Sequence, residues 1–152
     1  MWFIGISFLV AVTLLGNVHG LIDCDNVLRD TSTFEGRCNN KWHNLKGLVR
    51  PTQTQVGFAW VQWKLDKSFT SKNEAQEEMD ETPIPAVLGP VGNGTDGGFY
   101  IIDHHHELSA LDFSGYDDTS VTLIVVCDRR SMSLDAFWEF MEQEAKVFLL
   151  AH

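Results

Sequence analysis

The chain is poor in basic residues. It has 11 Lys and Arg against 21 Asp and Glu, which gives a formal net charge of −10 at pH 7. Proteins bind nucleic-acid backbones mainly by using Lys and Arg to displace counterions. The charge balance therefore argues against non-specific DNA binding, whereas a negative field favours solubility and tolerates divalent cations.

Lys, Arg, Asp and Glu are absent from the first 20 residues. An apolar run extends from Trp2 to Leu15, and the small residues Val18 and Gly20 stand shortly before Leu21. This pattern is typical of a secretory signal peptide, here residues 1–20. An uncleaved membrane anchor is the alternative, because the run is long enough to span a bilayer. We expect cleavage, and hence a secreted protein that has no contact with a membrane.

The cysteines and one sequon fit an extracellular location. The chain has three cysteines and no CxxC or zinc-finger spacing. In an oxidising compartment Cys24 and Cys38 are the natural disulfide pair, and their short loop would contribute about 3 kcal/mol. Cys127 ends an apolar run and is expected to be an inert core thiol. Asn93 begins an Asn-Gly-Thr sequon, which predicts N-glycosylation.

The apolar periodicity predicts a single small α/β domain without repeats or a linker. Residues 21–44 are polar and irregular, so we expect an N-terminal extension fixed by the disulfide, followed by the folded domain over 45–152. The prolines of the strand predicted over 84–88 favour a sheet edge or a strand start. The predicted elements are helices over 54–67, 73–80 and 107–111, a helix capped by Ser133, a hairpin of strands 84–88 and 99–102, and a buried strand over 121–127.

Four consecutive polar side chains, Asp103 to His106, follow the second strand of the predicted hairpin. Strand ends that lead into helices are common ligand sites, because the helix offers free N–H groups and a positive dipole end. A carboxylate and imidazoles there can bind phosphate, hold a metal ion or transfer protons. In strand geometry Asp103 and His105 share one face, so the carboxylate would orient that imidazole. The alternative is structural, with histidines that cap the helix and bond neighbouring loops.

The metal-binding prediction rests on incomplete motifs. The zincin pattern is absent, because no second histidine follows His106 and Glu107 at the required spacing. Two histidines on one strand face, His104 and His106, together with Asp103 would still suit zinc or manganese.

Three sequence blocks occur in the order and spacing of a known family. They are Arg50-Pro51-Thr52-Gln53, Ile84-Pro85-Ala86-Val87 and Tyr100-Ile101-Ile102-Asp103-His104-His105-His106. Together they resemble the putative ParB-like nuclease family of the ParB/sulfiredoxin superfamily, over roughly residue 45 to the C-terminus. The resemblance implies a small α/β (α+β) fold, with a mixed sheet flanked by helices and a phosphate-binding cleft where the histidines begin a helix.

The resemblance also implies phosphoryl chemistry on a nucleotide or nucleic acid. Asp103 and His105 would be catalytic, with His105 as the general base. A divalent ion (Mg, Mn or Zn), held by Asp103, His104 and His106, would neutralise the phosphate. The phosphate- or nucleotide-binding residues would be Arg50, Thr52, Gln53, His104 and His106. An ordinary surface role for Arg50 remains open, and the tryptophans are expected to be core or backbone-shaping residues.

Two departures from the family leave a second function open. Relatives often place an arginine after their histidines, where this chain has Glu107, and we expect family members to continue beyond the position of His152. The alternative is a non-catalytic extracellular protein that binds a nucleotide or metal. A sulfiredoxin-like reductase is disfavoured, because Cys127 is expected to be buried and no cysteine stands beside the histidines. The sequence carries no signal for an oligomeric state.

Overall fold

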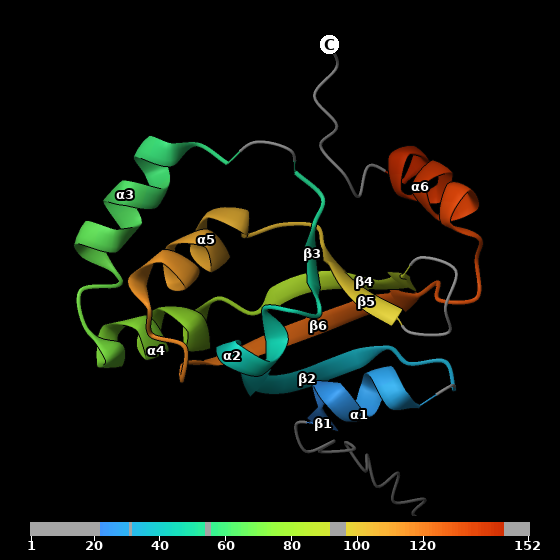
Figure 1. Ribbon diagram of the computed structural model, residues 1–152, viewed down its shortest axis with the longest axis horizontal. Coiled ribbons are helices and arrows are strands. Elements are labelled where there is room, and N and C mark those ends of the chain that lie inside the picture. Colours follow the sequence, from blue (N-terminus) through green and yellow to red (C-terminus); the bar gives the residue numbers. More distant parts are fainter. Residues whose placement is uncertain (1–21, 31, 54–55, 92–96, 145–152) are drawn as a thin grey trace, which may run out of the picture.

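The computed structural model describes residues 22–30, 32–53, 56–91 and 97–144 (Figure 1). The predicted signal peptide and Asn93 therefore lie outside the described residues. No helix within the described ranges is long and apolar enough to cross a membrane. The strands are β1 (Ile22–Asp23), β2 (Gly36–Lys41), β3 (Val49–Pro51), β4 (Ile84–Pro90), β5 (Gly97–Ile101) and β6 (Ser120–Asp128). The helices are α1 (Cys24–Arg29), α2 (Trp42–Leu45), α3 (Phe58–Lys67), α4 (Lys72–Glu81), α5 (His105–Ser114) and α6 (Leu134–Gln143).

The strands form one mixed sheet in the order β1-β2-β6-β4-β5-β3. Parallel pairs join β1 to β2, β4 to β6 and β3 to β5, and antiparallel pairs join β2 to β6 and β4 to β5. In Figure 1, α3, α4 and α5 gather on one side of the sheet, and α6 lies apart from them. The expected α/β fold with a mixed sheet and flanking helices is confirmed.

Each face of the sheet has its own core. Successive strand residues point to opposite faces, so Leu88 and Phe99 pack into the large core, which also includes residues of α3, α4 and α5. Their chain neighbours Val87 and Tyr100 join a smaller core with Phe137 of α6. The two cores place β3 and β5 between α5 on one face and α6 on the other.

The hairpin of β4 and β5 is antiparallel as predicted, with Ala86 opposite Ile101. The prolines were expected to mark a sheet edge or a strand start. The second alternative is confirmed, because Pro85 stands at the start of β4, which pairs with both β5 and β6. Pro85 and Pro90 stand close to the two ends of β4, where a missing N–H interrupts little of the ladder. The helix α5 extends to Ser114 and is longer than predicted, and Gly115 ends it in the left-handed region at φ 73°.

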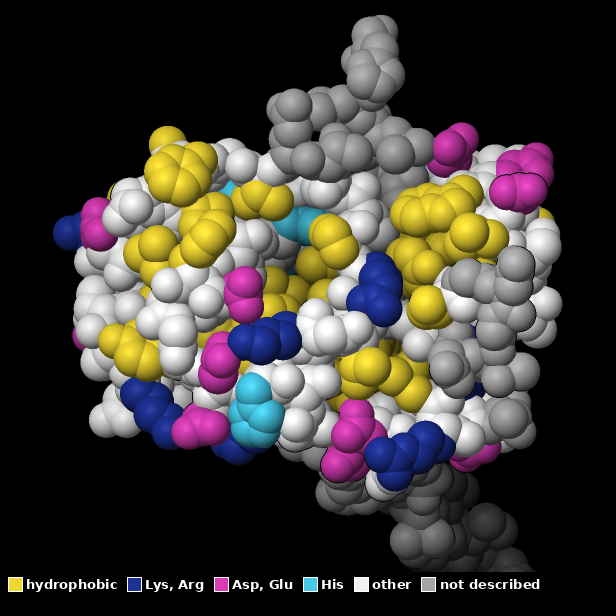
Figure 2. All heavy atoms as spheres, in the orientation of Figure 1, with side chains coloured by type: hydrophobic (Ala, Val, Ile, Leu, Met, Phe, Trp, Pro, Cys, Tyr) yellow, Lys and Arg dark blue, Asp and Glu magenta, His cyan; other side chains and the backbone are white. Residues whose placement is uncertain are grey.

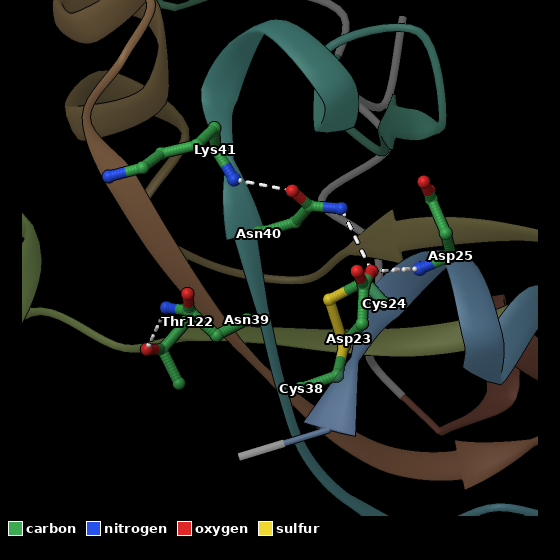
Figure 3. Close-up of a disulfide and its surroundings, with 8 residues drawn as sticks. All are labelled: Asp23, Cys24, Asp25, Cys38, Asn39, Asn40, Lys41 and Thr122. Atoms are coloured by element: carbon green, nitrogen blue, oxygen red, sulfur yellow. Dashed lines mark hydrogen bonds between the residues drawn. A yellow bond between two sulfur atoms is a disulfide. The ribbon is translucent and has the colours of Figure 1, made fainter.

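The segment before Leu45 contains regular structure that the polar composition did not predict. The strand β2 pairs with β6 along its full length, from Gly36 opposite Val125 to Lys41 opposite Ser120. The predicted disulfide is confirmed: Cys24 and Cys38 join α1 to β2 in the close-up of Figure 3. Residues 22–41 thus extend the sheet by two strands.

Candidate functional site

The amino end of α5 is shaped by a sharp turn after β5. His104 adopts φ 61° and ψ 31°, and α5 begins at the next residue. The Asp103 Oδ1 atom accepts a hydrogen bond from the His104 N–H at 2.7 Å. Strand geometry does not persist from Asp103 to His106, because the backbone leaves the strand at Ile101 and turns. A non-glycine residue in this region costs about 1–2 kcal/mol, so the surrounding contacts hold the turn.

His105 connects the start of α5 to the end of β3. Its side chain is 4% exposed, and its Nε2 accepts a hydrogen bond from the Thr52 N–H at 3.3 Å. The Thr52 hydroxyl donates to the Ile101 carbonyl at 2.6 Å. Burial lowers the pKa of His105, and the nearby Asp103 carboxylate offsets only part of this effect. The imidazole is therefore neutral, with its proton on Nδ1, and it holds the turn in place.

The sequence predicted a pairing of Asp103 with His105. The structure also places the Glu107 carboxylate beside the His104 imidazole. The Glu107 Oε2 lies 3.6 Å from the His104 Nδ1, and its Oε1 lies 3.1 Å from the Lys64 Nζ. The sequence analysis missed this pair, although an i, i+3 spacing on a helix was the available signal. Glu107 thus has two cationic or basic neighbours, Lys64 and His104.

Lys64 connects this pair to a second acidic residue. Its ammonium group bonds Glu78 as well as Glu107, and its side chain is 12% exposed. Burial by itself lowers the pKa of Lys64, but the hydrogen bonds to Glu78 and Glu107 more than offset it and leave the pKa above its usual value. The charge of Lys64 is consequently balanced within the protein.

His106 lies beside an exposed aromatic pair on α3. The Trp60 ring meets the His106 ring edge-on, with centroids 6.5 Å apart. Trp60 also stacks on Trp63, with centroids 4.8 Å apart and an interplanar angle of 11°. Trp60 and Trp63 are 50% and 46% exposed, so neither lies in the core, which was one of the two roles expected for the tryptophans. Gly57 also lies next to His106, because a Cβ at that position would meet the His106 Nε2 at 3.6 Å, an ordinary van der Waals contact.

The residues of β3 and the segment after it that were predicted to bind phosphate with the histidines are brought to them only in part. Thr52 contacts His105, and Gln53 follows it as a half-buried residue. Arg50 pairs in register with Tyr100, which belongs to the core under α6, and it donates to the Gly47 carbonyl at 2.7 Å. Strand alternation places Arg50 on the face opposite to α5. The structure therefore does not bring Arg50 together with the histidines.

The residues predicted to hold a metal ion do not fit one in this arrangement. Within the described part of the chain, no three His, Cys, Asp or Glu side chains are grouped so that they could hold a metal ion. Asp103 bonds the His104 N–H, and His104 faces Glu107. Metal binding stays a prediction, and no step below depends on it.

The amino end of α5 instead suits an anion. No side chain caps it, in contrast to α4 and α6, where Ser71 and Ser133 do so. Free N–H groups and the positive end of the dipole favour phosphate at such an end. The space-filling view shows histidine side chains at the upper edge of a central hollow (Figure 2). The geometry defines an α/β domain with a candidate ligand site where a sheet strand leads into a helix.

Comparison with known proteins identifies the family. Residues 44–152 match the family described as "Putative ParB-like nuclease", and the chain belongs to that family. The crystal structure of protein Atu1540 from Agrobacterium tumefaciens is similar, with 24% identity and a TM-score of 0.57. The similarity covers 78% of this chain and 52% of that one, so this chain spans about half of that protein, and the likeness shows the fold alone. No curated protein sequence matches the chain.

Proposed function

We propose that the chain cleaves a phosphate ester of a nucleotide bound at the amino end of α5. The observation that carries this proposal is the pair of His104 and Glu107, a carboxylate beside an imidazole at a helix end that no side chain caps. A carboxylate at Nδ1 orients the ring and leaves Nε2 available to take a proton. Membership in a nuclease-like family supports the same reaction class.

The first turn of α5 supplies the remaining groups. The free N–H groups and His106 bind the phosphate, and the Nε2 of His104 takes a proton from a water molecule that attacks phosphorus. The ester P–O bond breaks, and the leaving oxygen takes its proton from solvent. A general base of this kind contributes about 10²–10⁴ in rate. Asp103 and His105 position the turn through their bonds to the His104 N–H and Thr52 N–H.

The aromatic pair indicates a nucleotide as the substrate. Trp60 stacks on Trp63 beside His106, and an exposed indole face suits a nucleobase. Base–aromatic stacking is worth about 1–3 kcal/mol per base and tolerates any base. The net charge of −10 favours a mononucleotide or a short single strand over duplex DNA.

A non-catalytic nucleotide-binding protein is the second candidate. The observation that favours it is the engagement of His105, the residue first expected to be the base, whose Nε2 is occupied by the Thr52 N–H. The charge of Lys64 is likewise balanced by Glu78 and Glu107. In this candidate the same helix end binds phosphate without turnover.

One experiment separates the two candidates. The mature, disulfide-intact protein is incubated with ATP, ADP, CTP or a short oligonucleotide, each with and without Mg²⁺, Mn²⁺ or Zn²⁺, and both product release and thermal unfolding are measured. A ligand at a hundred times its Kd should stabilise the fold by about 2.7 kcal/mol. The matched variant is His104→Gly, because glycine accepts the left-handed backbone of this residue at no steric cost.

We expect His104→Gly to lower kcat by about 10²–10⁴ while the protein stays folded. The Glu107→Gln variant should lower kcat less, and Trp60→Ala should mainly raise KM for nucleotides. A ligand-dependent shift without turnover would select the binding protein. The absence of both turnover and a thermal shift with every ligand tested would contradict both candidates.

We also propose that the protein is secreted and works in an oxidising compartment. The disulfide between Cys24 and Cys38 supports this location, because such bonds persist mainly outside the cytosol. N-terminal sequencing of protein recovered from the medium of expressing cells is expected to begin at Leu21. Recovery of the chain only in membranes, with Met1 retained, would contradict the proposal.

A further inference from the structure

A cavity of about 380 Å³ opens between α5, α2 and β3. Figure 2 shows it as the hollow in the centre of this face, where hydrophobic side chains are exposed. One face of α5 lines it with His105, Leu108 and Ser109, which follow helical spacing. The cavity lies within the range of about 300–1,000 Å³ that is typical of small-molecule sites. It is distinct from the proposed phosphate site, because His104 and Glu107 do not line it.

The walls of the cavity are predominantly apolar. Val49 and Ile101 contribute from β3 and β5, and both belong to the buried core. Trp42 and Phe113 add aromatic rings, and Phe113 is 68% exposed although it is large and hydrophobic. A ligand that covers these side chains would gain about 25 cal/mol for each Å² of apolar surface that it removes from water. The walls therefore favour an apolar ligand body.

One imidazole lines this apolar space. The Nε2 of His105 accepts from the Thr52 N–H, so the neutral ring carries its proton on Nδ1. His105 is one of the residues that line the cavity, so a ligand there would lie against this imidazole. The Ser109 hydroxyl lies one helical turn further along the same wall.

The two charged residues at the cavity are already paired with protein groups. The Lys46 ammonium bonds Asp117 at 2.9 Å, and the Asp112 carboxylate accepts from the Trp42 indole N–H at 3.1 Å. Both charged groups therefore already have a hydrogen-bond partner within the protein. We propose that this cavity binds a small, neutral, mostly apolar molecule with one hydrogen-bond acceptor, such as a carbonyl oxygen, which His105 contacts.

Acetophenone and ethylbenzene test the proposal, because they share a phenyl ring and differ in the carbonyl oxygen. Their binding to the mature, disulfide-intact protein is measured by ligand-observed NMR titration. Ethylbenzene is the more apolar molecule and would bind tighter in a cavity without a donor. We expect acetophenone to bind about three- to tenfold tighter, because one hydrogen bond is worth about 0.5–1.5 kcal/mol. The charged analogue benzoate should bind more weakly than acetophenone.

Two variants locate the bound probe. Ser109→Phe fills the cavity and should weaken acetophenone binding at least tenfold, with Ser109→Leu as the substitute if the larger residue prevents folding. Trp63→Ala removes the exposed aromatic surface on α3 and should leave the affinity for acetophenone unchanged. Binding that survives the filling variant, or that is lost in Trp63→Ala, would overturn the proposal. Equal or tighter binding of ethylbenzene would overturn the role of the donor.

Discussion

The contact between His105 and Thr52 makes the stability of the protein depend on pH. Burial lowers the pKa of His105 from its usual value of 6.5. As the pH falls, the His105 imidazole therefore takes up a proton in the unfolded chain before it does so in the folded protein. The stabilisation by the buried, neutral imidazole is complete above pH 6.5 and decreases as the pH falls below it. The free energy of unfolding should decrease by up to about 1.4 kcal/mol per pH unit there. Urea unfolding at pH 7.5, 6.5 and 5.5 measures this dependence.

Two variants assign this dependence to one imidazole. His105→Gln cannot take up a proton in this range and should show a smaller difference between pH 7.5 and 5.5. His43→Gln, at an exposed site on α2, should keep the dependence of the unaltered chain. An identical pH dependence in His105→Gln and the unaltered protein would show that other groups cause it.

Arg130 connects the N-terminal segment to the end of β6. Its guanidinium bonds Asp128, and it donates to the carbonyls of Val27 at 2.9 Å and Ser32 at 2.8 Å. Burial raises the pKa of Asp128, but the bond to Arg130 more than offsets this and leaves the pKa below its usual value. Arg130→Ala leaves this carboxylate without its cation and should lower the free energy of unfolding by about 3 kcal/mol in urea titrations.

Arg130→Lys is the matched variant for this prediction. It keeps the charge but lacks the planar fork that reaches a carboxylate and several carbonyls at once. We therefore expect it to recover only part of the lost stability. Arg29 provides the control, because it is an exposed arginine of the N-terminal segment that Arg130 contacts. Arg29→Ala should change stability little. A comparable loss in both alanine variants would contradict a specific role for Arg130.

At the scale of the elements, the sequence predicted those with a clear apolar pattern. The strand β6 and the helix α6 have a buried face with regular spacing, and the hairpin strands β4 and β5 are buried almost throughout. Ser133 also caps α6 as predicted, since its side chain accepts from the Ala136 N–H. Local composition and burial agree in these elements, which is why the sequence was sufficient.

The strand β2 shows why composition failed elsewhere. Of its six residues only Cys38 is buried, so the strand has no apolar alternation. Its pairing depends on β6, which lies about 80 residues away in sequence, and on contacts such as the bond between Asn39 and Thr122 at 2.9 Å. Long-range partners of this kind leave no local pattern.

The sequence predicted where the candidate site lies in the fold, but not which of its side chains contact one another. The histidine segment does stand where β5 leads into α5, as the strand-then-helix pattern indicated. The positive φ of His104 then turned the segment out of strand geometry and changed which side chains meet. The chain carries no glycine there that would have signalled the turn. The pairing of Glu107 with both Lys64 and His104 depends on the packing of α3 against α5, which sequence spacing alone does not specify.

At the scale of the whole molecule, the disulfide fixes the outermost part of the sheet. Cys24 and Cys38 are 14 residues apart and join α1 to β2, while β1 consists of two residues paired with β2. Closing a loop of this size in the unfolded chain contributes about 3 kcal/mol. The Cys24→Ala/Cys38→Ala variant should therefore lose about 3 kcal/mol in urea unfolding, and dithiothreitol should produce a similar loss in the unaltered chain. Cys127→Ala is the control, because this thiol is buried in β6 outside the disulfide loop. A loss on reduction that persists in the double-alanine variant would show that dithiothreitol acts elsewhere.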